Sequence, residues 1–161
     1  MKVVVDTNVL ISGFLSPRGP PAEIARMILN GDLRICYDLR ILSEYKEVLG
    51  RPRFGISPVG SANLLEQILV TGESANALPL PPSLLDPGDE AFLEVAISCN
   101  ADCLITGNLK HFPVSCRRGV RVISPREFLA FYEGRETGGS GRVKNPAAEY
   151  KLRKLRKRKK D

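Results

Sequence analysis

Hydrophobic positions along the chain follow two patterns, short continuous runs and stripes at helical spacing. The valines at residues 3–5 form a run that predicts a strand buried on both faces, as in a parallel sheet covered by helices. In residues 39–49, apolar side chains recur at helical spacing, which predicts an amphipathic helix. Together the two patterns predict strands at 3–5, 33–37, 102–106 and 120–123, and helices at 20–30, 39–49, 61–70, 86–99 and 125–134.

Residues with strong turn or capping preferences separate these elements. Ser12-Gly13 and Ser16-Pro17-Arg18-Gly19 predict a flexible connection between the first strand and the first helix, and Pro79-Leu80-Pro81-Pro82 predicts an extended connector. Asp38 is expected to cap the helix at 39–49, and Ser124-Pro125-Arg126-Glu127 matches a capping box. The alternation of strands and helices predicts an α/β fold, a three-layer α/β/α arrangement with a central, mostly parallel sheet.

The length of 161 residues fits one domain followed by a tail of different composition. We expect the domain to span residues 1–134 and a flexible linker with a basic tail to span residues 135–161. The net charge of +6 is a property of residues 142–161, which carry ten Lys or Arg against two acidic residues. The tail is predicted to bind nucleic-acid phosphates, with an affinity that falls with salt, through Arg153, Lys154, Arg156, Lys157 and Arg158. The alternatives are a solubilising tail and a segment that folds as a helix on a partner protein.

Composition also argues against several classes of protein. No apolar run approaches the roughly 18 residues that span a bilayer, and the chain opens on a strand pattern instead of a signal peptide, so we expect a cytoplasmic protein with no membrane role. The four cysteines form no CxxC pair and are expected to be reduced and mostly buried. His111 is the only histidine, which excludes a His-rich metal centre. Glycine-rich phosphate loops and a nucleophile elbow are absent from the sequence.

Polar side chains follow the first buried strand at once. Asp6, Thr7 and Asn8 come directly after the valines, and ligands of parallel sheets bind beyond the carboxyl ends of the strands. Asp6 is therefore a candidate ligand, with Thr7 and Asn8 as supporting residues. The alternative is that Asp6 only caps a following turn or helix. Asn108 follows the strand at 102–106 in a similar way.

Helix geometry selects two further acids. Glu44 lies at the rim of an apolar stripe and can reach a cleft, whereas Glu47 lies almost opposite that stripe. Asp89 points partly inward from the first turn of its helix, whereas Glu90 and Glu94 point well away from the apolar face. The alternatives are a solvated helix glutamate at 44 and a favourable charge at a helix N-terminus at 89.

If Asp6, Glu44 and Asp89 meet, their repulsion requires cations or raised pKa values. Two carboxylates ~4 Å apart repel each other by about 4 kcal/mol at an effective dielectric constant of 20. Oxygen ligands without a usable histidine or thiolate select hard ions, so we expect one or two Mg or Mn ions. Such a site activates water and stabilises a leaving oxygen, which predicts nuclease-like chemistry.

Four segments in this order resemble a PIN domain over about residues 1–134, and their spacing is similar to the branch that contains the toxin components of toxin–antitoxin pairs. They are residues 4–10, 43–45, 86–96 and 101–108. The resemblance implies a metal-dependent endoribonuclease of three-layer α/β/α fold, often a homodimer, with RNA as substrate and an antitoxin protein as partner. It also implies catalytic and metal-binding roles for Asp6, Glu44 and Asp89, a metal ligand at Asn108, and supporting roles for Asn8 and Thr106.

Asn108 departs from the family pattern, because many members have Asp at this position. An amide oxygen ligates a metal but adds no charge, so a second ion should be held more weakly. From the resemblance as a whole we expect a Mg- or Mn-dependent endoribonuclease, the toxin of a toxin–antitoxin pair. The alternative is a catalytically weak or inactive PIN-like module that binds RNA or protein.

Overall fold

Five parallel strands form a central sheet in the order β3-β2-β1-β4-β5. The structure is a computed structural model and describes residues 1–138. β1 lies between β2 and β4, so polar residues that follow it have neighbouring strand ends on both sides. The strands are β1 (Lys2–Val5), β2 (Arg34–Tyr37), β3 (Glu73–Ser74), β4 (Cys103–Ile105) and β5 (Val122–Ile123).

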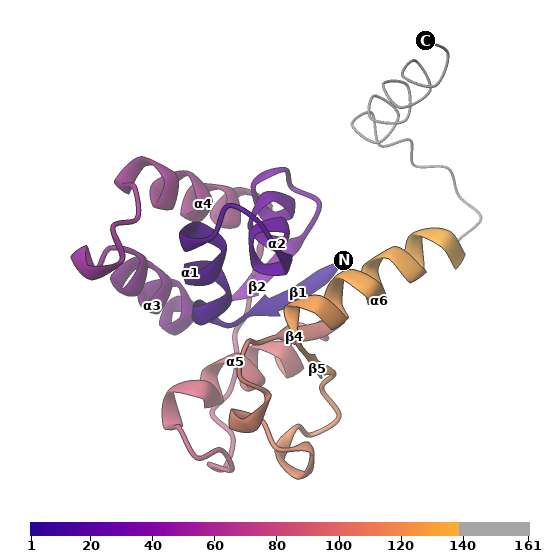
Figure 1. The fold of residues 1–161 in the computed structure, drawn as a ribbon. Coiled ribbons are helices and arrows are strands. Elements are labelled where there is room, and N and C mark those ends of the chain that lie inside the picture. Colours follow the sequence, from indigo (N-terminus) through magenta and orange to yellow (C-terminus); the bar gives the residue numbers. More distant parts are fainter. Residues whose placement is uncertain (139–161) are drawn as a thin grey trace. The chain divides into compact units, whose positions relative to one another are not determined.

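Helices cover both faces of this sheet (Figure 1). Helices α1 to α4 lie on one side, and α5 packs against β1, β2 and β4 from the other. The predicted three-layer α/β/α fold is therefore confirmed. The α-helices are α1 (Thr7–Leu15), α2 (Pro20–Leu29), α3 (Leu39–Leu49), α4 (Pro58–Thr71), α5 (Pro87–Ser98) and α6 (Pro125–Gly138), and the 3-10 helices are η1 (Pro52–Phe54), η2 (Leu109–His111) and η3 (Val114–Cys116).

Residues Met1–Phe131 form one compact unit, and a second unit begins at Tyr132 within α6. Along residues 1–138, none of the helices combines the length and the apolar character that a membrane crossing requires. The linker and tail that we predicted at residues 135–161 begin four residues too early, because α6 continues to Gly138. The remainder, including the basic tail at 142–161, lies outside the described residues.

Helix α1 replaces the first part of the connection that we predicted after the first strand, at Ser12-Gly13, whereas residues 16–19 connect α1 to α2 as predicted. Asp6 caps α1 by accepting the backbone N–H of Asn8 at 3.1 Å, and the helix buries Val9 and Leu10. Gly13, which suggested a break, serves helix packing instead, since a Cβ there would lie 2.7 Å from the carbonyl oxygen of Pro21. The prediction was wrong at Gly13 because glycine in this helix permits close contact between α1 and α2.

The predicted caps of two other helices are confirmed. Asp38 accepts the backbone N–H groups of Arg40 and Ile41 at 3.0 and 3.1 Å, so α3 begins where predicted. Ser124 and Glu127 form the capping box of α6, and their hydrogen bonds lower the pKa of the Glu127 carboxyl. Local capping chemistry therefore sets these helix starts.

Candidate metal centre

Asp6 and Thr106 meet because β1 and β4 are neighbours in the sheet. The backbone N–H of Asp6 donates to Ile105, and the fully buried Thr106 hydroxyl donates to Asp6 Oδ2 at 2.7 Å. The backbone N–H of Asn108 in turn donates to the Thr106 hydroxyl at 3.0 Å. Thr106 thus connects the residue after β1 to the residue at the start of η2. The side chain of Asn108 does not cap η2.

Helix α3 brings Glu44 to the same end of β1. The neighbouring Tyr45 is fully buried and its hydroxyl donates to the carbonyl oxygen of Val5, which attaches α3 to the strand. Thr7 then donates its hydroxyl to Glu44 Oε1 at 2.5 Å. Glu44 therefore reaches the site as helix geometry predicted.

Glu47 is exposed, as its position opposite the apolar stripe predicted, yet it also lines a groove. It pairs with Arg51 at 2.7 Å, and its side chain is 70% exposed. The groove that contains it also contains Thr7 and Glu44. The residues after α3 that also line the groove are Arg51, Arg53 and Phe54. Their positions cannot be predicted from the periodicity of α3.

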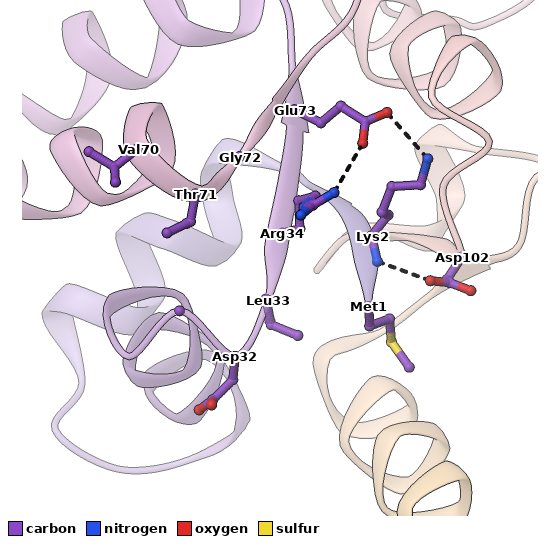
Figure 2. Close-up of a pocket in the computed structure, with 11 residues that line it drawn as sticks. Met1, Lys2, Asp32, Leu33, Arg34, Val70, Thr71, Gly72, Glu73 and Asp102 are labelled. Carbon is purple, nitrogen blue, oxygen red and sulfur yellow. Dashed lines mark hydrogen bonds and ion pairs between the residues drawn. The ribbon is translucent and has the colours of Figure 1, made fainter. Parts of the chain in front are cut away.

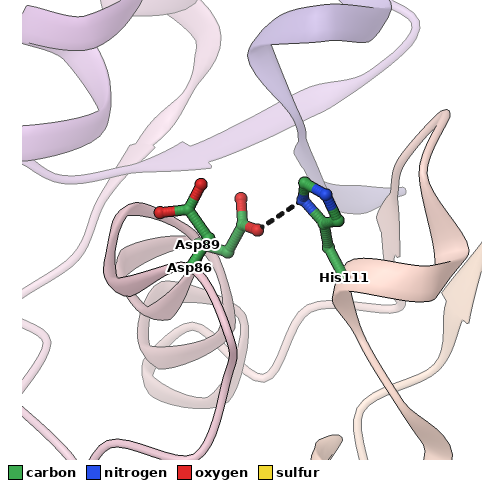
Figure 3. A group of neighbouring side chains, drawn as sticks. All are labelled: Asp86, Asp89 and His111. Carbon is green, nitrogen blue, oxygen red and sulfur yellow. Dashed lines mark hydrogen bonds and ion pairs between the residues drawn. The ribbon is translucent and has the colours of Figure 1, made fainter.

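The amino-terminal turn of α5 supplies two acids and faces an imidazole. Asp89 Oδ2 lies 2.9 Å from His111 Nδ1, and one ligand atom from each of Asp86, Asp89 and His111 lies within 4.8 Å of the other two (Figure 3). Asp86 caps α5 through the backbone N–H of Gly88 at 2.8 Å. Figure 3 shows both carboxylates at the start of the helix and the His111 ring directed towards Asp89.

Electrostatics show that these acids act on one another. Burial and the negative charge of Asp6 raise the pKa of Asp89 to about 6, although the hydrogen bond with His111 opposes that shift. Burial also raises the pKa of Glu44, against the hydrogen bond from Thr7, and the charges of Asp6 and Asp86 add to the increase. Acids from three separate segments therefore share one electrostatic field.

His111, which we expected to be unusable as a ligand, lies beside Asp89 and was missed as a candidate site residue. From the sequence we excluded a His-rich centre but did not consider a single histidine beside carboxylates. A signal was present, because His111 follows the buried strand β4 within the same polar segment as Asn108. Helix η2 turns that segment back towards α5.

Glu90 and Glu94 point away from the apolar face of α5, yet both are buried. Glu90 Oε1 accepts the backbone N–H groups of Ser83 and Leu84, and Glu94 Oε1 accepts that of Leu80 at 2.7 Å. Glu94 also pairs with Arg40 at 2.7 Å. These two acids hold the connector between β3 and α5 against the helix. They are structural acids, and this connector leads directly to Asp86.

A second hollow, of about 760 Å³, lies at the opposite end of the strands (Figure 2). Its charged side chains satisfy one another: Lys2 Nζ lies 3.2 Å and Arg34 NH1 3.8 Å from oxygens of Glu73. The backbone N–H of Lys2 donates to Asp102 at 3.0 Å. Charge compensation and the position at the amino ends of the strands make this hollow a poor candidate for the site.

Comparison with known families decides the classification of the chain. The family model for the PIN domain matches residues 2–110. The match includes the proposed acidic ligands and Asn108, and it ends one residue before His111. The chain belongs to the PIN domain family. No curated protein matches this PIN domain closely enough to be named as a relative.

PIN domains are generally metal-dependent nucleases, and the side chains present here fit a divalent cation. Carboxylate oxygens favour Mg and Mn, and the imidazole of His111 adds a nitrogen donor that widens the range of metals. Within residues 1–138, no lysine or arginine forms an ion pair with Asp6, Glu44 or Asp89. The acids of this PIN domain are therefore suited to a divalent cation.

Proposed function

We propose that this PIN domain hydrolyses RNA phosphodiester bonds as a Mg- or Mn-dependent endoribonuclease. The observation that carries the proposal is the electrostatic coupling of Asp6 with Glu44 and Asp89, none of which forms an ion pair with a lysine or arginine of residues 1–138. Carboxylates held in this way are stable only when protonated or bound to cations. Such acids bind hard metals, and hard-metal sites are suited to phosphoryl chemistry.

Each proposed ligand is oriented by a neighbour within this chain. Asp6 receives hydrogen bonds from Thr106 and from the backbone of Asn8, and Thr7 holds Glu44. Asp89 is held by His111. A bound divalent ion would polarise the phosphodiester and lower the pKa of a water molecule. The residues proposed to hold it are the group of Asp86, Asp89 and His111, whose ligand atoms lie within 4.8 Å of one another, together with Asp6, Glu44 and Asn108, which are not part of that group.

Cleavage of RNA by the purified chain tests this proposal. We expect cleavage with Mn or Mg, none with a chelator, and none in Asp6→Asn or Asp89→Asn, because each amide removes a charge that the ion requires. Glu66→Gln is the matched control, since Glu66 is an exposed acid of α4 and the variant should cleave like the wild type. Cleavage that persists unchanged in Asp6→Asn contradicts the proposal.

A binding module without cleavage is the second candidate, and Asn108 favours it. The amide supplies no charge where the family pattern has an acid, so a second ion is held weakly. The variant Asn108→Asp separates the two proposals: a large gain in cleavage indicates a weak nuclease, whereas RNA binding without cleavage in both forms indicates a binding module.

We propose further that the chain is the toxin of a toxin–antitoxin pair, acts in the cytoplasm and forms a homodimer. The support is the similarity of its motifs to that branch of the family. Expression of the chain in a bacterial host should arrest growth, and Asp89→Asn should relieve the arrest. Sedimentation of the purified chain tests the dimer, and growth that continues despite active enzyme contradicts the toxin role.

A further inference from the structure

A groove of about 400 Å³ runs alongside the candidate metal centre, between α1, α3 and η1. Thr7 and Glu44 line it, and both belong to the centre. Arg53 and Phe54, from η1, line it as well. The groove therefore connects one proposed metal ligand, Glu44, to a basic and aromatic pair for which the sequence predicted no role.

Arg53 is the groove cation that is not already neutralised. Arg51 pairs with Glu47 at 2.7 Å, whereas no acid of residues 1–138 forms an ion pair with Arg53. The Arg53 guanidinium lies over the Phe54 ring, 4.6 Å from its centroid. Stacking leaves the edge of the guanidinium free to donate hydrogen bonds, and phosphate oxygens match that donor geometry.

Helix η1 presents this pair on a defined backbone. Pro52 is its first residue, and Gly55 ends it in the left-handed region with φ of 59°. Proline and the turn at Gly55 limit the conformations of the three residues between α3 and the following segment. The backbone that carries the stacked pair is thus restricted before any ligand binds, which lowers the entropic cost of binding.

The remaining walls of the groove are apolar as well as charged. Ile11 and Val48 line it together with Phe54. Apolar and aromatic surface contacts the face or edge of an unstacked base, whereas a duplex keeps its base faces stacked inside. A polyanion that approaches the acidic centre also needs a positive charge beside it, and Arg53 supplies that charge.

We propose that the groove binds an unpaired RNA strand beside the scissile bond, with Arg53 on a phosphate and Phe54 against a base or sugar. This inference names the substrate strand of the proposed nuclease and so rests on that function. It makes Arg53 and Phe54 binding residues that select single-stranded over double-stranded RNA.

The test compares binding of labelled single-stranded and duplex RNA to the full chain in a chelator, where no cleavage occurs. Arg53→Ala should weaken single-strand binding about tenfold and duplex binding much less, and Arg53→Lys should recover only part of the loss because it keeps charge without the stack. Phe54→Leu should act in the same direction. Arg126→Ala is the matched control, since Arg126 is an exposed arginine outside the groove.

Cleavage kinetics give a second measurement. Arg53→Ala should raise KM about tenfold with little change in kcat, because Arg53 holds the strand and does not contact the reacting atoms. Equal loss of affinity in Arg53→Ala and Arg126→Ala, or equal loss for single-stranded and duplex RNA, overturns the inference. If cleavage is absent but the Arg53-dependent preference for single strands remains, the proposed nuclease fails and the binding site stands. If cleavage occurs but Arg53→Ala changes neither KM nor binding, the proposed nuclease stands and the proposed binding site fails.

Discussion

The two oxygens of the Asp6 carboxylate are held by different neighbours. Oδ1 accepts the backbone N–H of Asn8 and so caps α1, while Oδ2 accepts the hydroxyl of Thr106. The cap and the ligand, which the sequence left as alternatives, are compatible, because each carboxylate oxygen has a further lone pair for a cation. At the scale of single residues, Thr106 therefore orients the carboxylate of Asp6, which we propose as a metal ligand.

Replacing Thr106 tests this orientation. Thr106→Val keeps the shape of a fully buried side chain but removes the hydroxyl between Asp6 and the backbone of Asn108. We expect Mn affinity to fall by about 10–100-fold, as for other residues that orient metal ligands, measured by calorimetric titration of the ion. Thr106→Ser retains the hydroxyl and should stay near the wild type. Unchanged affinity in Thr106→Val would show that Asp6 needs no such support.

At the scale of elements, the site depends on the contact between α1 and α2 and on the connector before α5. Gly13 permits the first, since a Cβ there would meet the carbonyl oxygen of Pro21 at 2.7 Å and Cβ of Ala25 at 3.0 Å. Glu94 secures the second through the backbone of Leu80. Both contacts join separate segments, and the hydrophobic pattern of one segment does not predict which other segment it contacts.

Gly13→Ala should destabilise the fold although alanine is the better helix former. The added methyl group meets backbone of α2, so the two helices must separate, at a cost of about 1–3 kcal/mol. Gly60→Ala is the matched control in α4, where the nearest atom, on Phe14, lies at 3.4 Å, and it should be neutral or stabilise by about 0.4–1 kcal/mol. Urea unfolding measures both, and equal stabilities of the two variants would contradict this account of the packing.

At the scale of the whole molecule, strand order creates the site. β1 and β4 are neighbours although about a hundred positions separate Asp6 from Thr106, and η2 then returns His111 to α5. The ordered sheet thus gathers acids whose mutual repulsion opposes folding. A cation that bound only the folded chain would offset this repulsion, so we expect metal binding and stability to be linked.

Metal-dependent stability tests that link. Saturating Mn should raise the unfolding temperature relative to a chelator, and at about 100 times its Kd the ion stabilises the fold by about 2.7 kcal/mol. Asp89→Asn removes one of the repelling charges, so it should shift less with Mn, while Glu66→Gln should shift like the wild type. Thermal unfolding with and without the ion measures both, and an equal shift in Asp89→Asn would exclude that residue as a ligand.

The sequence alone was sufficient where the determinants are local. Three valines marked the central strand, Asp38 and the Ser124–Glu127 box marked helix starts, and the rim position of Glu44 predicted the side of α3 that faces the site. Each of these depends on groups a few residues apart along the chain, whose spacing is set by helix or strand geometry. The match of residues 2–110 to the PIN domain reflects the same ordered pattern.

Only the tertiary structure decided which distant groups meet. Helix α1, the partnership of Asp89 with His111 and the burial of Glu90 and Glu94 all depend on contacts between separate segments. The groove that joins Glu44 to Arg53 exists because η1 follows α3 in a particular direction. Periodicity describes the faces of one element, whereas burial and charge pairing depend on what covers that element. For this reason the acids of the candidate site could be predicted from the sequence, whereas the residues that contact them are known only from the fold.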